Sequence, residues 1–376
     1  MPPLVFLLST AVFAQGTSEF MLAGLLTDIA TDLHTTVPRA GLLTSAFAIG
    51  MVVGAPVMAV ATRQCPPRLA LCSLLATFIA MHVLGASTDS YALLFVSRVV
   101  AAFANAGFLA LTLAMVSALV TPDRHSRAIA TILAGTTLAL VVGVPAGTLV
   151  GALLDWRAAL WGVALLSVPA LIAVSMTAPT TQDWRSDGSL TTEFTVLQRQ
   201  SLIRVLVLCV LVNGATFCSF TFLASVVTER AELQSAMVPV VLALFGLGAL
   251  GGVWAAGRFG DRYATTIVSS GGAALVVGWC LLALLSQSPV GVLVFAFVQG
   301  GLSFALGSTL VSLVMRNAVG APTMAGSFAT ASLNIGAAAG PALGGLVYGS
   351  SLGTVGPLAT SAVMVGVALV ASVLLT

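Results

Sequence analysis

Residues 91–113 read YALLFVSRVVAAFANAGFLALTL, an apolar run in which Arg98 is the only charged residue. A membrane-crossing helix needs about 20 mainly apolar residues, so this segment by itself predicts a transmembrane span. The rest of the chain has the same character: 59% of its 376 residues are hydrophobic and 7% are charged, whereas soluble domains carry about 25% charged residues. The lipid bilayer is therefore the predicted solvent and partner of this protein.

Clusters of charge, proline and glycine divide the chain into twelve such segments. We predict an all-α membrane protein with transmembrane helices at 4–27, 39–61, 68–87, 91–113, 126–151, 157–177, 203–227, 237–257, 264–286, 289–314, 323–348 and 353–375. No basic residue precedes the first segment, so we expect it to be an uncleaved span rather than a signal peptide.

Arginine supplies all the basic charge of the chain, and its distribution predicts the orientation. With a cytoplasmic N-terminus, the inner loops hold ten arginines, namely Arg63, Arg68, Arg124, Arg127, Arg185, Arg199, Arg204, Arg258, Arg262 and Arg316. The outer loops hold three, Arg39, Arg157 and Arg230. Because basic residues concentrate on the cytoplasmic side of membrane proteins, we expect both termini to be cytoplasmic.

Weak internal repeats predict two halves of six helices each. Gln15-Gly16 and Asn213-Gly214 are 198 residues apart, Arg63 and Arg262 are 199 apart, and Pro145 and Pro341 are 196 apart. A near-constant offset indicates duplication, which is a common plan of secondary transporters with a site between the halves.

The polar stretch 179–202 lies between these halves and is interpreted as a solvated cytoplasmic linker; it contains Asp183, Arg185, Asp187, Glu193 and Arg199. The predicted domains are therefore a six-helix bundle at 1–178 and another at 203–376. Asp28 and Asp32, at the outer end of the first span, are read as a solvated loop face.

Glu19 and Arg98 are the candidates for proton coupling, because each is a charged residue inside a predicted span. A rise of 1.5 Å per residue places Glu19 about 12 Å and Arg98 about 10 Å below the outer edge. Opposite charges at one depth favour pairing, and burial disfavours the charged form of a carboxyl. We interpret Glu19 as a proton carrier that pairs with Arg98 in one state; a structural ion pair is the alternative.

Substrate contacts are sought among the few other polar residues inside spans. Their hydrogen-bonding side chains and the neighbouring phenyl rings suit a cavity for an amphiphilic molecule. The candidates are Asn213, Asn105, Gln299, Asn334, Phe20 and Phe217. For each residue taken singly, helix–helix hydrogen bonding or packing explains its presence equally well.

Several other classes of function are excluded or disfavoured. The sequence has no cluster of His and Asp residues and no nucleophile paired with a base, so it does not suggest an enzyme. Its three histidines lack the spacing of metal ligands, and no cofactor motif is present. The chain has no lysine for a phosphate-binding loop, which excludes an ATP-driven pump in this chain. A net charge of +2 without a basic run excludes nucleic acid as a partner.

Four motifs together resemble the drug/proton antiporters of the major facilitator superfamily, and the resemblance covers the whole chain. They are Gly257-Arg-Phe-Gly-Asp261-Arg262, an inner-loop signature; Ser97-Arg98-Val-Val, a fourth-span motif; Gly135 to Gly147 with Pro145, a fifth-span antiporter motif; and Asp155-Trp156-Arg157. In the first half Arg63 is kept, whereas Thr62 stands where the family usually has Asp.

The resemblance implies roles in gating. Arg63, Asp261 and Arg262 match the inner-loop signatures and would form an inner gate. The glycine–proline positions Gly143, Pro145, Gly147, Gly340 and Pro341 would hold the two halves together in one state. Ordinary close packing of helices through small residues is the other reading of these glycines.

Residues 11–26 and 42–56 look like actinobacterial chloramphenicol exporters. This likeness implies a monomeric transporter of the bacterial cell membrane, which exchanges protons for a small lipophilic drug such as chloramphenicol by alternating access. Sugar-efflux relatives share the Glu19-Phe20 and Gly54-Ala-Pro56 elements, so an arabinose-like sugar transporter is the alternative. A channel would not need duplicated halves or antiporter motifs.

Overall fold

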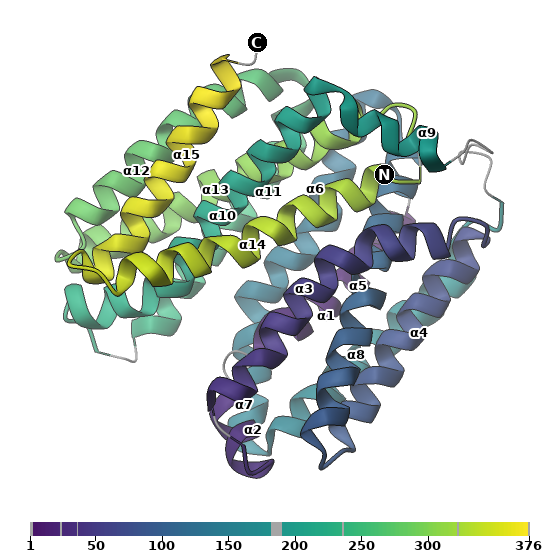
Figure 1. Ribbon diagram of the computed structural model, residues 1–376, viewed down its shortest axis with the longest axis horizontal. Coiled ribbons are helices and arrows are strands. Elements are labelled where there is room, and N and C mark those ends of the chain that lie inside the picture. Colours follow the sequence, from purple (N-terminus) through teal and green to yellow (C-terminus); the bar gives the residue numbers. More distant parts are fainter. Residues whose placement is uncertain are drawn as a thin grey trace. The chain divides into compact units, whose positions relative to one another are not determined.

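The computed structural model describes residues 3–22, 25–35, 37–181, 190–234, 237–321 and 323–374 (Figure 1). These residues form helices and connecting turns, without a strand. The linker charges Asp183, Arg185 and Asp187 lie outside the described residues.

The helices follow the predicted spans closely. In the first half they are α1 (Pro3–Met21), α2 (Leu26–Asp32), α3 (Val37–Ala61), α4 (Pro67–Ala86), α5 (Tyr91–Leu119), α6 (His125–Leu138), α7 (Val144–Leu153) and α8 (Trp156–Thr177). After α9 (Leu190–Thr195), the second half contains α10 (Gln200–Ser225), α11 (Val238–Thr266), α12 (Gly272–Leu284), α13 (Pro289–Asn317), α14 (Ala325–Tyr348) and α15 (Gly356–Leu374).

Among the described residues, ten continuous helical runs are long and apolar enough to cross a membrane. One of them, Val238–Leu284, has 47 residues, about twice the 20 or so residues that one span needs, and a kink at Tyr263 divides it. It therefore supplies two spans. The less apolar α14, with 24 residues, is the twelfth, so the predicted twelve-span fold is confirmed.

The break expected at 258–263 between two spans is present as a kink. The non-helical dihedral angles of Tyr263 (φ −121°, ψ 26°) divide α11 into two helices after Arg258 and Arg262. A π-helical turn, Ile267–Gly271, then leads into α12. The glycines and charges of this stretch therefore mark the place where one helix ends and the next begins.

The fifth span shows how a helix accommodates proline. α6 passes into α7 through a π-helical turn at Ala139–Gly143, and Pro145 follows at the start of α7. Proline removes a backbone donor and its ring collides with the carbonyl four residues earlier. The wider π turn absorbs this defect without ending the helix.

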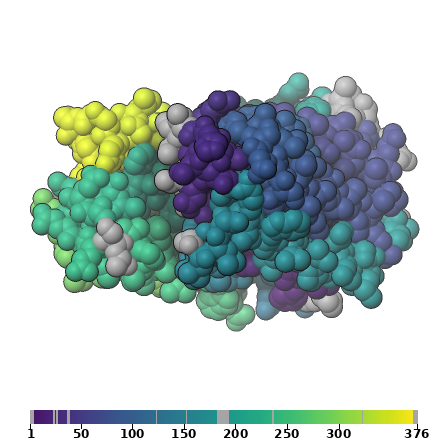
Figure 2. All heavy atoms as spheres, turned by 90° about the horizontal axis from the view of Figure 1, so that it is seen from below, coloured from purple at the N-terminus to yellow at the C-terminus, as the bar shows by residue number. Residues whose placement is uncertain are grey.

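The chain divides into two compact units. The first comprises residues 1–120, 131–196 and 318–331, and the second comprises 121–130, 197–317 and 332–376. The predicted boundaries at 178 and 203 stay a prediction. In the first unit, α5 packs against α3 and α4, while α8 packs against α1 and α4. Figure 2 shows the purple and blue side chains of these early helices closely packed.

The second unit repeats these contacts. There α13 packs against α11 and α12, while α15 packs against α10 and α12. α11 and α13, which are spans 8 and 10, pack together like α3 and α5, which are spans 2 and 4. α10 and α15, which are spans 7 and 12, pack together like α1 and α8, which are spans 1 and 6. The two six-helix bundles are therefore pseudo-symmetric, as the repeated motifs predicted.

Candidate functional site

A cluster of buried polar side chains lies inside the first unit, where hydrocarbon-like surroundings would otherwise be expected. It contains Ser18 and Glu19 of α1, His82 of α4, and Arg98 and Asn105 of α5. Arg98 is 2% exposed, and its guanidinium lies over the ring of Phe47 of α3, 4.4 Å from the ring centroid. Four helices thus surround one fixed positive charge.

Glu19 and Arg98 lie in the same cluster but do not form a direct ion pair among the described residues. Arg98 instead donates from Nη1 to Ser18 Oγ (2.7 Å) and from Nη2 to the Ser18 carbonyl (2.9 Å). Arg98 is thus held at the residue that precedes Glu19 in α1. The direct contact expected from their equal depth is therefore replaced by contact with the neighbouring residue.

Glu19 has a neutral partner. Asn105, two turns from Arg98 on α5, donates from Nδ2 to a Glu19 carboxyl oxygen at 3.5 Å. Glu19 is half-buried, whereas Asn105 is buried. Asn105 was predicted as a substrate contact, and its observed contact is with the carboxyl. A half-buried carboxyl with a single weak donor can exchange a proton more readily than one held by a guanidinium fork.

His82 and Ser18 belong to the cluster, although neither was predicted from the sequence as a site residue. His82 is 2% exposed, with Nε2 2.5 Å from Ser18 Oγ and Nδ1 2.7 Å from the Phe78 carbonyl. Its position inside the predicted span 68–87 was a sufficient signal, because an ionisable residue within a membrane segment is a functional candidate by default. Ser18 gave no such signal, since serine is common in membrane helices.

In the second unit, Asn213 of α10 donates from Nδ2 to the Leu333 carbonyl of α14 at 2.7 Å. Beside it, Phe217 and Phe220 meet edge to face with centroids 6.3 Å apart, and Phe220 contacts Phe245 at 5.0 Å. Asn213 therefore joins two helices next to an aromatic group. This geometry fits helix packing, and it leaves the predicted substrate role untested.

The remaining substrate candidates differ in burial. Gln299 of α13 is fully buried and donates to the Leu275 carbonyl of α12 at 3.1 Å, while its Oε1 has no hydrogen-bond partner among the described residues. Asn334 is buried on α14, and Phe20 is half-buried on α1. The Gln299 amide is thus used between two helices. The three candidates lie on three different helices.

Glycines bring corresponding helices into close contact in both units. A methyl group at Gly143 would overlap Thr17 of α1, and one at Gly147 would lie 3.0 Å from the Met21 sulfur. In the second unit, a methyl group at Gly340 would overlap the Gly214 carbonyl of α10. Span 5 therefore packs on span 1, and span 11 packs on span 7. Pro145 and Pro341 lie within these packed segments.

Among the predicted inner-gate residues, Asp261 has the clearest contact. Both of its carboxyl oxygens accept from the Ser126 backbone N–H at the start of α6, at 3.1 and 3.3 Å. Arg262 is exposed and lies over the Tyr263 ring. Arg63 follows the end of α3 and is half-buried. The anionic member of the signature thus caps a helix N-terminus.

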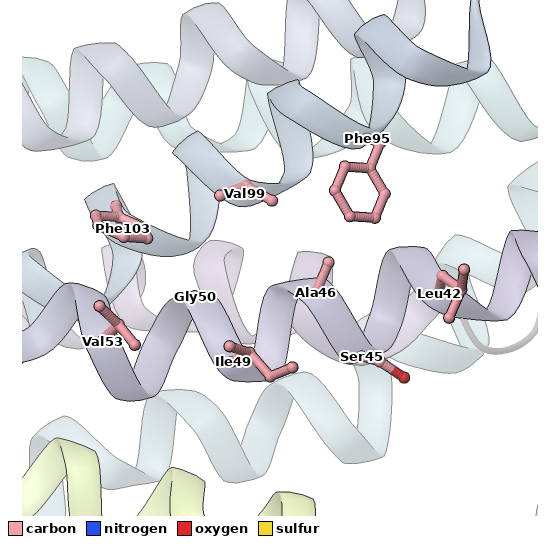
Figure 3. A pocket seen from close by; sticks show the side chains of 9 residues that line it. All are labelled: Leu42, Ser45, Ala46, Ile49, Gly50, Val53, Phe95, Val99 and Phe103. Carbon is pink, nitrogen blue, oxygen red and sulfur yellow. The ribbon is translucent and has the colours of Figure 1, made fainter.

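An apolar groove runs between α3 and α5 (Figure 3). Its volume is about 380 Å³, and its lining includes Ile49 and Val53 of α3 with Phe95, Val99 and Phe103 of α5. Ser45 is the one polar residue among the described residues that line it. A ligand site normally has convergent polar groups, so we assign the groove no ligand.

Comparisons with known proteins agree with this architecture. The family profile described as Major Facilitator Superfamily matches residues 8–331. A chloramphenicol resistance protein of Streptomyces lividans is 50% identical over 98% of this chain and 95% of its own length. The inner membrane transport protein YdhP of Escherichia coli K12 is 30% identical over 96% of this chain and 93% of its own length.

Solved structures show the same fold. The human organic anion transporter MFSD10 (TETRAN) superposes with a TM-score of 0.80 at 19% identity, covering 99% of this chain and all of its own. The E. coli fucose:proton symporter FucP has a TM-score of 0.79 at 14% identity, covering 100% of this chain and 99% of its own. With its twelve spans and its matching sequence profile, this chain belongs to the Major Facilitator Superfamily and is a multi-pass membrane transporter rather than an enzyme.

Proposed function

We propose that this transporter exports a small lipophilic drug, of which chloramphenicol is the expected example, in exchange for protons. The observation that carries the proton coupling is the half-buried Glu19 carboxyl next in the chain to Ser18, which binds the buried Arg98 guanidinium. The relative from S. lividans, which is named for chloramphenicol resistance, supports the choice of drug.

The residues of the cluster have different roles in the proposed proton exchange. The Arg98 charge favours ionised Glu19, and burial favours the neutral acid. Because these two effects oppose each other, a modest change in access to water is enough to load or release a proton. Asn105 can hydrogen-bond to either form of the carboxyl, since its amide offers both a donor and an acceptor. Alternating access then exposes Glu19 to one side of the membrane at a time.

The test is drug-driven proton movement in proteoliposomes containing the wild type, Glu19→Gln or the control Glu232→Gln. Glu232 is an exposed carboxyl in the turn after α10, so its variant makes the same chemical change outside the cluster. We expect Glu19→Gln to abolish drug-driven proton movement while drug exchange down a gradient continues, and Glu232→Gln to resemble the wild type. Undiminished proton movement in Glu19→Gln would contradict the proposal.

Sugar transport is separated from drug transport by accumulation assays. Cells that express the protein should accumulate less labelled chloramphenicol than cells without it, and their content of labelled arabinose should not change. A change in arabinose alone would assign the transporter to sugars.

We further propose a monomer in the bacterial cell membrane with both termini cytoplasmic, which the arginine distribution supports. In the gating mechanism, Asp261, Arg262 and Arg63 act at the inner end. Gly143, Pro145, Gly147, Gly340 and Pro341 hold the two halves together in one state. We keep Asn213, Asn334, Phe20 and Phe217 as proposed substrate contacts, with Asn105 shared between the substrate and Glu19. Gln299 is the weakest candidate, because both its burial and its hydrogen bond serve helix packing.

A further inference from the structure

His82 is a buried imidazole that the proposed exchange at Glu19 does not itself use. It lies in α4, where its ring contacts Phe78 with centroids 4.1 Å apart. Its Nε2 faces both Ser18 Oγ at 2.5 Å and Arg98 Nη1 at 3.4 Å. An aromatic residue of the same size would fill this space without the cost of burying a polar ring. The polar atoms of His82 therefore require an explanation.

The hydrogen bonds around His82 have only one consistent direction. The Phe78 carbonyl can only accept, so Nδ1 carries the proton and donates to it at 2.7 Å. Nε2 of the neutral imidazole is then an acceptor. Arg98 can only donate, and Ser18 Oγ accepts from its Nη1 at 2.7 Å. The single hydroxyl proton of Ser18 is thus left to point at His82 Nε2.

The direction of these hydrogen bonds determines where the Arg98 guanidinium lies. With its proton turned to His82, the Ser18 hydroxyl presents its lone pairs to Arg98, and the Ser18 carbonyl accepts a second bond at 2.9 Å. Arg98 is therefore held at Ser18, one residue from Glu19, without closing on the carboxyl itself. A protonated His82 would present two donors and would stand beside a second cation, which would break the chain.

We propose that His82 is a positioning residue for proton exchange: its neutral Nε2 aligns the Ser18 hydroxyl, which holds Arg98 beside Glu19 but out of a direct ion pair. The inference rests on the proposed role of Glu19. Without the acceptor at Nε2, the Ser18 proton loses its partner. The hydroxyl can then rotate, and Arg98 is free to close on Glu19 and trap it as a salt bridge.

The test compares His82→Gln with His82→Asn, which retain different halves of the imidazole. A glutamine amide reaches the place of Nε2 and can offer its carbonyl oxygen to Ser18. An asparagine amide reaches only the place of Nδ1, where it can donate to the Phe78 carbonyl. In proteoliposomes, we expect His82→Gln to keep most drug-driven proton movement and His82→Asn to lose about tenfold, as befits a lost bond in a charged network.

A second arm removes the middle of the chain. In a Ser18→Ala background the acceptor at position 82 has no hydroxyl to align. His82→Gln and His82→Asn should then give equal rates of proton movement, because substitutions in one hydrogen-bond network do not have additive effects. Protein amount in the membrane and thermal unfolding in detergent are measured for every variant. Should His82→Asn not accumulate, His82→Phe takes its place in both backgrounds. A loss of proton movement in the presence of Ser18 that disappears in Ser18→Ala supports the alignment role, and an equal further loss in both backgrounds overturns it.

The outcomes separate this inference from the proposed function. The positioning role is overturned if His82→Asn couples like the wild type, or if His82→Asn and His82→Gln lose drug-driven proton movement equally. If Glu19→Gln has lost this movement as well, the proposed exchange mechanism still stands. Normal coupling in Glu19→Gln removes the proposed function itself, whatever the His82 variants do.

Discussion

The Glu193 carboxylate accepts hydrogen bonds from the backbone N–H of Thr323 at 2.9 Å and from that of Met324 at 3.0 Å, within the first unit. Glu193 belongs to α9, in the stretch read from the sequence as a solvated linker, and it is 1% exposed. The interpretation of residues 179–202 as a solvated linker is therefore wrong for Glu193. The carboxylate binds the free amide groups that precede α14, where an anion is favoured by the helix dipole. The neighbouring Phe194 packs on Phe328, with centroids 6.3 Å apart.

Glu193→Ala is therefore expected to destabilise the protein by about 1 kcal/mol or more, because it leaves two buried N–H groups without a partner. Glu193→Gln keeps one acceptor oxygen and should lose less. The measurement is thermal unfolding of the purified protein in detergent. Glu232→Ala, at an exposed carboxyl, is the control. Equal unfolding temperatures for Glu193→Ala and the control would show that the contact does not stabilise the fold.

Asp32 should make stability depend on pH. Its carboxylate accepts from Arg157 and from Trp156 Nε1, and the hydrogen bond from Arg157 holds the pKa of Asp32 below its usual value. A lowered pKa in the folded state gives stability that is present above the unfolded value of about 3.9. This stability is lost as pH falls through the folded pKa. Since Asp32 is largely exposed, we expect less than about 1 kcal/mol.

The measurement is thermal unfolding of the wild type and Asp32→Asn at pH 7 and near pH 3. The difference in unfolding temperature between the two proteins should be present at pH 7 and should be smaller at the lower pH. Asp28→Asn, at a position of the same helix α2, serves as the control. A gap that is as wide at pH 3 as at pH 7 would argue against a charged contact.

Gly340→Ala should separate α14 from α10. The added methyl group would overlap the Gly214 carbonyl, which is backbone and cannot rotate away. Overpacking of this kind costs about 1–3 kcal/mol. Gly366→Ala is a matched control in α15, because nothing lies within 4 Å of its added methyl group. There the better helix propensity of alanine should make the protein equally or slightly more stable. Similar unfolding temperatures of the two variants would refute the close approach.

Asp261 and Arg262, predicted together as gate residues, should respond differently to substitution. Asp261→Ala removes the acceptor for the Ser126 N–H at the start of α6 and should cost about 1 kcal/mol. Asp261→Asn keeps a carbonyl oxygen and should cost less. Arg262→Gln changes an exposed side chain and should stay within about 0.5 kcal/mol of the wild type. Unfolding in detergent measures all three, and a larger loss in Arg262→Gln than in Asp261→Ala would reverse this assignment.

Much of the architecture could be predicted from the sequence, because the bilayer imposes a simple rule on composition. Long apolar runs predicted the spans, and repeated glycine–proline motifs predicted two related halves. Glycine and charge also predicted a break at 258–263, and it corresponds to the kink at Tyr263 that divides α11.

The candidate site was predicted only in part. Glu19 and Arg98 were identifiable as charges in apolar runs, and the helical rise gave their depth. The sequence could not reveal that Arg98 turns to Ser18, because a rise per residue gives height along a helix but not the direction of a side chain across the bundle. Glu193 was misjudged for the same reason, since its partner Thr323 lies 130 residues away in the chain. His82, in contrast, was identifiable from its position inside a predicted span.

The sequence by itself therefore determined the solvent of this protein, the number of its spans and the duplication of its halves, since these follow from local composition and from motifs repeated along the chain. Only the tertiary structure decided which polar groups meet. In a low-dielectric interior each buried donor needs an acceptor, and the packing of α1, α4 and α5 chose Ser18 as the acceptor for Arg98.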